Sequence, residues 1–330
     1  MMFLSRVWLG LRTGGHGRRI IVWAKIMLSL SLLGLLLLYV NWSEIPYYLQ
    51  AISPLTLGTV FFLLILQFPI STLKWKQSLE IHHLHYSFGF LQKVLCIGFF
   101  INNFLPTMIG GDGYRILKTI PRNGFKSRAV SAVLLERLIG FSVLMILGLV
   151  GGLFALTDNQ SYIVNYYVGA SLLLGASGIA LLLAVRRGAF SSLARRVTKM
   201  QKMKILTTNI DHIRRDSKRL WTIILVSALF QGIAIAVIYL LFISVGAERV
   251  LAKCALIGAI AGIASILPIS INGIGVAEGS FVFAAHELGI DFDQAIVVAF
   301  LLRILVLPLS VICGLVYLAD THHWRSTHRP

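Results

Sequence analysis

Ionisable side chains inside apolar segments are the residues of this sequence whose chemistry most needs an explanation. A charged group at membrane depth costs roughly 2.5–3.5 kcal/mol on insertion scales, so it normally has a partner or a function. Asp112 and Glu278 are 166 residues apart. The same interval separates Arg137 from Arg303. We predict that six residues bind substrate, namely Asp112, Arg115, Glu136, Arg137, Glu278 and Arg303.

The types of these residues fit an amphiphilic ligand. An arginine guanidinium matches phosphate bidentately, and a carboxylate could bind a cationic headgroup or carry a proton. Structural interpretations stay open beside these. Asp112 and Glu278 could cap the helices that follow them. Arg115 could extend to the membrane interface, while Glu136, Arg137 and Arg303 could form ion pairs that only hold helices together.

Composition places these residues in a membrane protein. Of the 330 residues, 57% are hydrophobic and 13% are charged, and the mean hydropathy is +0.82. An ordinary soluble domain is about 25% charged, and apolar runs of about 18 residues or more indicate membrane spans. Eight apolar runs are present, at 20–40, 55–73, 88–109, 129–156, 162–185, 220–245, 252–281 and 295–318. The first is too long for a signal peptide and lacks a cleavage site, so we expect it to remain.

The charges between the runs predict their orientation, because basic segments stay in the cytoplasm. Segments without Lys or Arg are 41–54, 157–161 and 282–294, and segments rich in them are 110–128 and 186–219. We read 74–87, with Lys74 and Lys76, as a cytoplasmic loop, and 246–253 as external. The basic N-terminus 1–19 and the tail 319–330 are then both cytoplasmic.

The net charge of +17 does not indicate a nucleic-acid partner, because Lys and Arg lie between the apolar runs and not along one face. We expect the segment 186–219 to form an amphipathic surface helix on anionic phospholipid. The expected partners are therefore membrane lipids and no nucleic acid.

Two apolar runs return to the side from which they start. The run 88–109 lies between cytoplasmic segments, and 252–281 lies between external ones. Proline and glycine break helices and permit tight reversals. We therefore predict re-entrant turns around Pro106, Gly110, Gly111, Pro268, Gly273 and Gly275. Broken backbone at membrane depth needs protein or a water-filled cavity around it, so the two turns should face each other.

These features predict an all-α polytopic membrane protein with six full spans and two oppositely oriented re-entrant helical hairpins. The halves 20–156 and 157–318 each contain three spans and one hairpin, and the odd number inverts the second half. Inverted repeats with interrupted helices are typical of transporters whose site lies near the bilayer midplane. We therefore predict one charged cluster at the midplane, formed by Asp112, Arg137, Glu278 and Arg303.

Other reactive side chains carry no recognisable motif. The three cysteines, Cys96, Cys254 and Cys313, are widely spaced and lie in apolar runs, which excludes a metal or disulfide pattern. The histidines of segment 82–85 are read as interface residues. We expect no catalytic residue, no metal and no cofactor.

One known family has similar motifs. The similar segments are Gly110-Gly111-Asp112-Gly113-Tyr114-Arg115, Glu136-Arg137, Asn272-Gly273-Ile274-Gly275-Val276-Ala277-Glu278-Gly279 and Arg303. They resemble the lysylphosphatidylglycerol synthase transmembrane family, a flippase-like membrane domain, over roughly 20–320. The resemblance implies a bacterial or archaeal inner-membrane protein that handles a lipid or lipid-linked substrate. Synthase members carry an aminoacyltransferase domain after this part. None follows here before Pro330, so we expect no aminoacyl transfer.

Taken together, the sequence predicts a flippase-like transporter of a phospholipid or lipid-linked substrate. Its nearly symmetric motifs favour transport, because alternating access needs two halves that exchange roles around one site. A membrane-embedded transferase and a non-catalytic partner of a separate enzyme remain alternatives. The sequence leaves open whether the protein forms a homo-oligomer.

Overall fold

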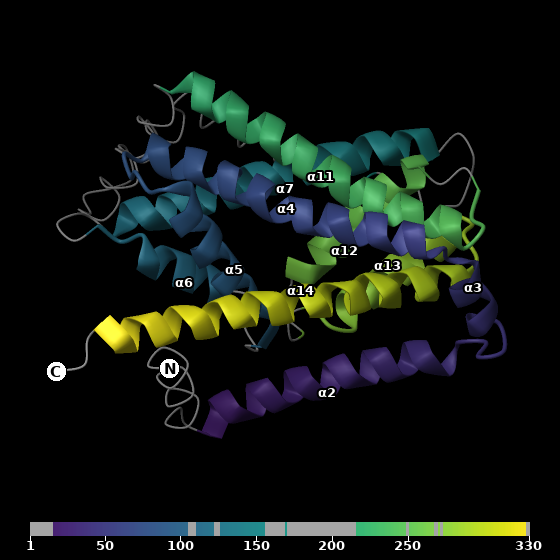
Figure 1. Ribbon diagram of the computed structural model, residues 1–330. Coiled ribbons are helices and arrows are strands. Elements are labelled where there is room, and N and C mark those ends of the chain that lie inside the picture. Colours follow the sequence, from purple (N-terminus) through teal and green to yellow (C-terminus); the bar gives the residue numbers. More distant parts are fainter. Residues whose placement is uncertain are drawn as a thin grey trace.

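The computed structural model describes residues 16–104, 110–121, 126–155, 169, 216–248, 251–266, 270 and 273–327. Within these ranges the chain forms helices joined by short turns, and no strand (Figure 1). The helices are α2 (His16–Leu38), α3 (Ile45–Ala51), α4 (Pro54–Ile81), α5 (Phe88–Phe104), α6 (Gly110–Lys118), α7 (Ser127–Ala155), α11 (Ser217–Ser244), α12 (Leu251–Ile266), α13 (Val276–Glu287) and α14 (Phe292–Thr327).

Among the described helices, four are long and apolar enough to cross a membrane: α4, α7, α11 and the part of α14 up to Asp320. Each has 28 or 29 residues in that stretch. At about 1.5 Å per residue they are about 42 Å long, which exceeds the roughly 30 Å hydrocarbon core. The chain is therefore a polytopic helical membrane protein. The predicted span 162–185 and the basic segment 186–219 lie almost entirely outside the described residues, so the number of six spans stays a prediction.

Side-chain caps mark where three long helices begin. Ser53 precedes α4 and accepts a hydrogen bond from the amide three residues later, at 3.1 Å. Asp216 does the same before α11 at 3.2 Å, and Asp291 before α14 at 3.1 Å. These oxygens satisfy amide groups that the first helical turn leaves without a partner. Pro54 also favours the start of α4, because its fixed φ suits the first helical position.

Two pairs of shorter helices occupy the places of the predicted hairpins. α5 packs on α6, and α12 packs on α13. With 17 and 16 residues, the longer member of each pair reaches about 25 Å, short of the roughly 30 Å core. Gly273 and Gly275 form the turn before α13 with φ of +73° and +81°, which favours glycine. Gly110 and Gly111 begin α6 instead of lying in the turn, and Pro106 and Pro268 lie outside the described residues.

Segments on both sides of the α5–α6 pair lie at the same end of the bundle. Tyr86, before α5, donates its hydroxyl hydrogen bond to the Thr119 carbonyl after α6, at 3.1 Å. Figure 1 shows the C-terminal end of α14 at this end as well. There Lys93 of α5 pairs with Asp320 of α14 at 2.6 Å.

Segments on both sides of the α12–α13 pair lie at the opposite end, beside α3 (Figure 1). Gln294 at the start of α14 donates to the Val245 carbonyl at the end of α11, at 3.0 Å. The backbone amide of Asn41 donates to Asp293 at 3.1 Å. Each end of the bundle thus carries loops that the charge pattern assigns to one side of the membrane, and the two ends correspond to the two sides. Which end faces the cytoplasm stays a prediction.

Contacts between helices repeat from one half to the other. α7 packs on α12 of the second half, and α14 packs on α5 of the first. Likewise, α4 contacts α5 and α7 as α11 contacts α12 and α14, while α6 contacts α7 as α13 contacts α14. The α4–α11 contact pairs two equivalent helices with each other. This correspondence is what an internal repeat requires.

The loop predicted at 74–87 begins too early. α4 continues to Ile81, so Lys74 lies in the helix and is 7% exposed. Charge alone suggested a loop, but the helix continues after Lys74 and buries Trp75 and Leu79, which are four residues apart on one face. Lys74 therefore belongs to the interior of the protein and carries no information about orientation.

Cysteine labelling tests this arrangement of ends. In a variant whose native cysteines are replaced by alanine, His85→Cys and Lys118→Cys should react with a membrane-impermeant maleimide from one side only, and from the same side. Tyr47→Cys, on exposed α3, should react from the other side. Labelling of positions 85 and 118 from opposite sides would make the segment between them a full span and contradict the hairpin.

Close packing of α5 on α6 predicts a sharp difference between two glycines of one helix. A Cβ at Gly111 would lie 2.2 Å from the Gly98 carbonyl oxygen, whereas a Cβ at Gly113 meets no atom within 4 Å. Gly111→Ala should destabilise the protein by about 1–3 kcal/mol through overpacking. Gly113→Ala should be neutral, or stabilising by up to about 1 kcal/mol from helix propensity. Thermal unfolding in one detergent measures both, and equal effects would show that the helices are not in this contact.

Candidate functional site

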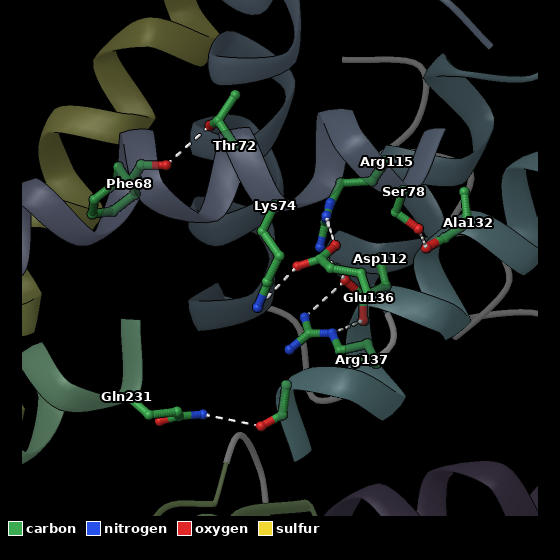
Figure 2. Close-up of polar contacts among 11 residues, drawn as sticks. Phe68, Thr72, Lys74, Ser78, Asp112, Arg115, Ala132, Glu136, Arg137 and Gln231 are labelled. Atoms are coloured by element: carbon green, nitrogen blue, oxygen red, sulfur yellow. Dashed lines mark hydrogen bonds and ion pairs between the residues drawn. The ribbon is translucent and has the colours of Figure 1, made fainter. Parts of the chain in front are cut away.

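Five charged residues from three helices meet near the start of α7. Lys74 comes from α4, Asp112 and Arg115 from α6, and Glu136 and Arg137 from α7. Figure 2 shows the two carboxylates between the three cations. This set is called the first charged group below.

Each carboxylate of the first charged group is held by two cations. Glu136 accepts from Arg115, and its other oxygen lies 3.3 Å from the Lys74 ammonium. Asp112 accepts from Arg137 Nε at 3.0 Å and from an Arg137 terminal nitrogen at 2.8 Å. Arg115 also donates to Asp112 at 3.2 Å. Both oxygens of both acids are therefore engaged by protein cations.

The helices place these groups by simple geometry. Glu136 and Arg137 are neighbours in sequence, and neighbours point about 100° apart on a helix, so each faces a different partner. Asp112 lies in the first turn of α6, where the helix dipole favours negative charge. Arg115 follows three residues later on the same face and reaches both acids.

Burial differs sharply across the first charged group. Glu136, Arg115 and Lys74 are 2%, 5% and 7% exposed, whereas the Arg137 side chain is 57% exposed. Three cations and two acids leave one positive charge in excess. The group is thus closed and neutralised inside and presents a cation at its open end.

Trp75 completes the closed side of this group. The Arg115 guanidinium carbon lies 4.2 Å from the centre of the Trp75 ring, a cation–π contact. Two buried donors, Trp75 Nε1 and Arg115 Nε, have no acceptor among the described residues. The closed side of the group thus has more hydrogen-bond donors than acceptors, and the group as a whole has more positive than negative charges.

The second half contains a simpler counterpart. Glu278, in the first turn of α13, accepts from Arg303 of α14 and from the Gly275 amide at 2.8 Å. Its partner follows 25 residues later, the same interval that separates Asp112 from Arg137. Glu278 and Arg303, called the second charged pair below, line a pocket of about 220 Å³. The other lining residues are apolar, namely Ala261, Ala277, Phe281, Ala299, Leu302 and Val306.

The predicted single cluster is therefore two separate groups. Asp112 pairs with Arg137 and Glu278 pairs with Arg303, and among the described residues no hydrogen bond or ion pair joins one group to the other. The reason is that each acid lies in the first turn of the second helix of a pair, α6 or α13, and the helix that follows supplies its arginine. Pairing stays within each half.

Two members of the site were missed in the sequence. Lys74 was read as a loop charge, and Trp75 was not singled out. The available signal was the helical spacing of Trp75 and Leu79 after Lys74, with no glycine or proline before Ile81 to end the helix. The interpretation of Arg115 as an interface residue is wrong, because its side chain is buried between Asp112 and Glu136.

Metal-binding groups are not found in the described part of the chain. It contains no group of three or more His, Cys, Asp or Glu side chains that could hold a metal ion. His82, read as an interface residue, is 1% exposed, and its Nδ1 lies 2.8 Å from the Ser78 carbonyl oxygen. The three cysteines are free thiols.

Comparison with known families identifies one match. The family described as lysylphosphatidylglycerol synthase TM region matches residues 22–314, which include both charged groups and both helix pairs. No curated protein matches the chain, and no solved structure does.

Removal of a buried acid should be far more costly than removal of a surface cation. Glu136→Gln leaves Lys74 without a compensating charge and leaves Arg115 with only Asp112, which Arg137 also engages; breaking a buried pair costs about 3–5 kcal/mol. Arg219→Ala is the control, because Arg219 is 39% exposed and pairs with Glu80 and Asp216 at the end of the bundle. Its loss should cost about 0–1 kcal/mol.

Thermal unfolding and yield of monodisperse protein measure this difference. Equal unfolding temperatures for the two variants would show that Glu136 is hydrated and not part of a closed network. The ion pair that the control variant removes depends on pH. Burial raises the pKa of Asp216, but the hydrogen bonds from Arg219 outweigh burial and lower that pKa. The small contribution of this pair to stability is therefore present above the ordinary carboxyl pKa and is lost as the pH falls through the lowered value.

Proposed function

The chain belongs to the lysylphosphatidylglycerol synthase TM-region family, and we propose that it is a flippase-like transporter of a phospholipid or lipid-linked substrate. The observation that carries this proposal is the repetition of one acid–arginine pair, at the same 25-residue spacing, in both halves of the chain. Ionisable residues inside membrane segments are rare and mark substrate or ion pathways, and a buried salt bridge by itself is weak evidence of a stabilising role. A pair that recurs in two related halves suits alternating access.

The membrane arrangement proposed with this function has six spans and two re-entrant hairpins. The spans are α2, α4, α7, the run 162–185, α11 and α14, and the hairpins are α5–α6 and α12–α13. The span proposed for the run 162–185 is supported by the positions of its neighbours, because α7 ends and α11 begins at opposite ends of the bundle (Figure 1). We place the protein in the cytoplasmic membrane of a bacterium or archaeon with both termini inside. The basic segment 186–219 then lies on anionic phospholipid.

The proposed transport step is an exchange of partners by the two arginines. The exposed Arg137 can bind a headgroup phosphate at the open end of the first charged group, and Arg303 can do the same in its pocket. Asp112 and Glu278 hold these arginines when no phosphate is present, so neither charge is left alone in the membrane. Glu136 and Arg115 keep α6 and α7 together while Asp112 is released.

Reconstitution into liposomes tests transport directly. Wild-type protein should move acyl-labelled phospholipid between leaflets, and a reductant that bleaches only the outer leaflet measures the rate. Arg137→Ala and Arg303→Ala should each lower the rate by about a hundredfold, because a charge-assisted contact worth about 1.5–3 kcal/mol is lost and an acid is left unpaired. Lys93→Ala is the control, since Lys93 is 44% exposed and pairs at the end of the bundle.

Two results would contradict transport. A modified lipid formed without movement between leaflets would indicate a membrane-embedded transferase. Neither movement nor product, in well-folded protein, would indicate a partner that acts through a separate enzyme.

A further inference from the structure

The two charged groups are not equivalent in what they leave available to a ligand. In the first, Lys74 and Arg115 occupy both oxygens of Glu136, and Arg137 and Arg115 occupy those of Asp112. No carboxylate oxygen there is without a cation. The first charged group can therefore offer a ligand donors, chiefly those of the exposed Arg137, but no carboxylate oxygen that lacks a cation.

The second charged pair can both donate hydrogen bonds to a ligand and accept them from one. Arg303 engages only Glu278, through Nε and one terminal nitrogen, so the other terminal nitrogen has no partner among the described residues. Arg303 engages Glu278 Oε1, whereas the partner of Oε2 among the described residues is the uncharged Gly275 amide; a carboxylate has about four acceptor positions in all, so Oε2 can still accept from a cation. Both residues line the pocket of about 220 Å³. A ligand there can meet a donor and an acceptor at once.

The sequence shows how this difference arises. Phe281 and Leu302 stand 166 residues after Arg115 and Glu136, at the equivalent positions of the second half. Where the first half fills its site with charge, the second half has two apolar side chains that line the pocket. The second charged pair is therefore neutral as a whole and is surrounded by apolar groups.

Charge balance selects the ligand of such a site. A net charge brought into an apolar pocket beside a neutral pair stays uncompensated, which is costly. A headgroup that carries one positive and one negative charge leaves no excess. We propose that the second charged pair binds the headgroup of a zwitterionic phospholipid with a primary amine, the ammonium on Glu278 and the phosphate on Arg303. As a step of transport this rests on the proposed function; as binding it does not.

The amine distinguishes this ligand from other zwitterionic lipids. A primary ammonium donates up to three hydrogen bonds, whereas the quaternary ammonium of phosphatidylcholine has no N–H group for Glu278. Phosphatidylglycerol is anionic and has no ammonium. The expected order of binding is phosphatidylethanolamine first, then phosphatidylcholine, then phosphatidylglycerol.

Lipid retention by purified protein tests the inference. Delipidated protein is incubated with equimolar phosphatidylethanolamine, phosphatidylcholine and phosphatidylglycerol, and bound lipid is counted by native mass spectrometry. Glu278→Gln should lower retention of phosphatidylethanolamine by about tenfold or more, the size of a lost charge-assisted hydrogen bond, and should abolish its advantage over phosphatidylcholine. Glu80→Gln, the same change in a carboxylate at the end of the bundle, should change nothing.

Two further variants separate the pocket from the fold. Ala299→Leu fills the pocket without touching a charge, so it should lower retention of phosphatidylethanolamine even if Glu278→Gln cannot be purified. Asp112→Asn, at the equivalent acid of the first half, should impair transport yet keep the preference for phosphatidylethanolamine. Equal retention of the three lipids by wild-type protein, or loss of the preference in Asp112→Asn, would overturn the proposal.

The liposome assay distinguishes this inference from the proposed function. Lipids labelled on an acyl chain leave the amine free, so their rates can be compared directly. Transport of all three lipids at one rate, with unselective retention, would refute the zwitterion site and keep the transporter. Selective retention without transport would keep the site and refute the transporter.

Discussion

The need to neutralise charge in an apolar medium governs the arrangement of this protein. Glu136 is 2% exposed, and its two oxygens engage cations from two other helices, Lys74 of α4 and Arg115 of α6. None of the three residues could remain charged at membrane depth alone. Their contact fixes the rotation of α4 and α7 against each other and ties Arg115 of α6 to both helices. The helix pair α5–α6 is thereby tied to the long helices on which it lies.

Close approach of helices makes those contacts reachable. α5 and α6 touch backbone to backbone at Gly98 and Gly111. α7 approaches α12 in a similar way, since a Cβ at Gly148 would lie 2.3 Å from that of Ala259. Without a hydrophobic force between helices in lipid, small residues of this kind provide the packing that holds helices together. The first contact closes one helix pair, and the second joins the two halves of the chain.

The two halves share one charged pair but differ in what surrounds it, and both facts bear on function. The acid–arginine pair recurs with the same spacing and the same helical elements. Its surroundings do not recur, because Phe281 and Leu302 stand at the positions of Arg115 and Glu136. One half is thus closed by its own charges, while the other retains a pocket. A transporter whose two arginines both meet the phosphate, but which recognises the rest of the headgroup in one half, would need this division.

The sequence by itself determined the membrane class, the family, the places of both helix pairs, and the pairing of equivalent positions at an offset of 166 residues. Composition, glycine and proline are local signals, and they are sufficient for those conclusions. Only the tertiary structure decided which charges meet. In the structure, Lys74 joins the first charged group and Arg115 is buried within it. Asp112 and Arg137 form one pair, and Glu278 and Arg303 form another. The physical reason is that α7 and α11 are apolar on nearly every side, so their sequence patterns do not indicate which face contacts which neighbouring helix. Partner choice then depends on packing and rotation, which the order of residues along one helix does not reveal.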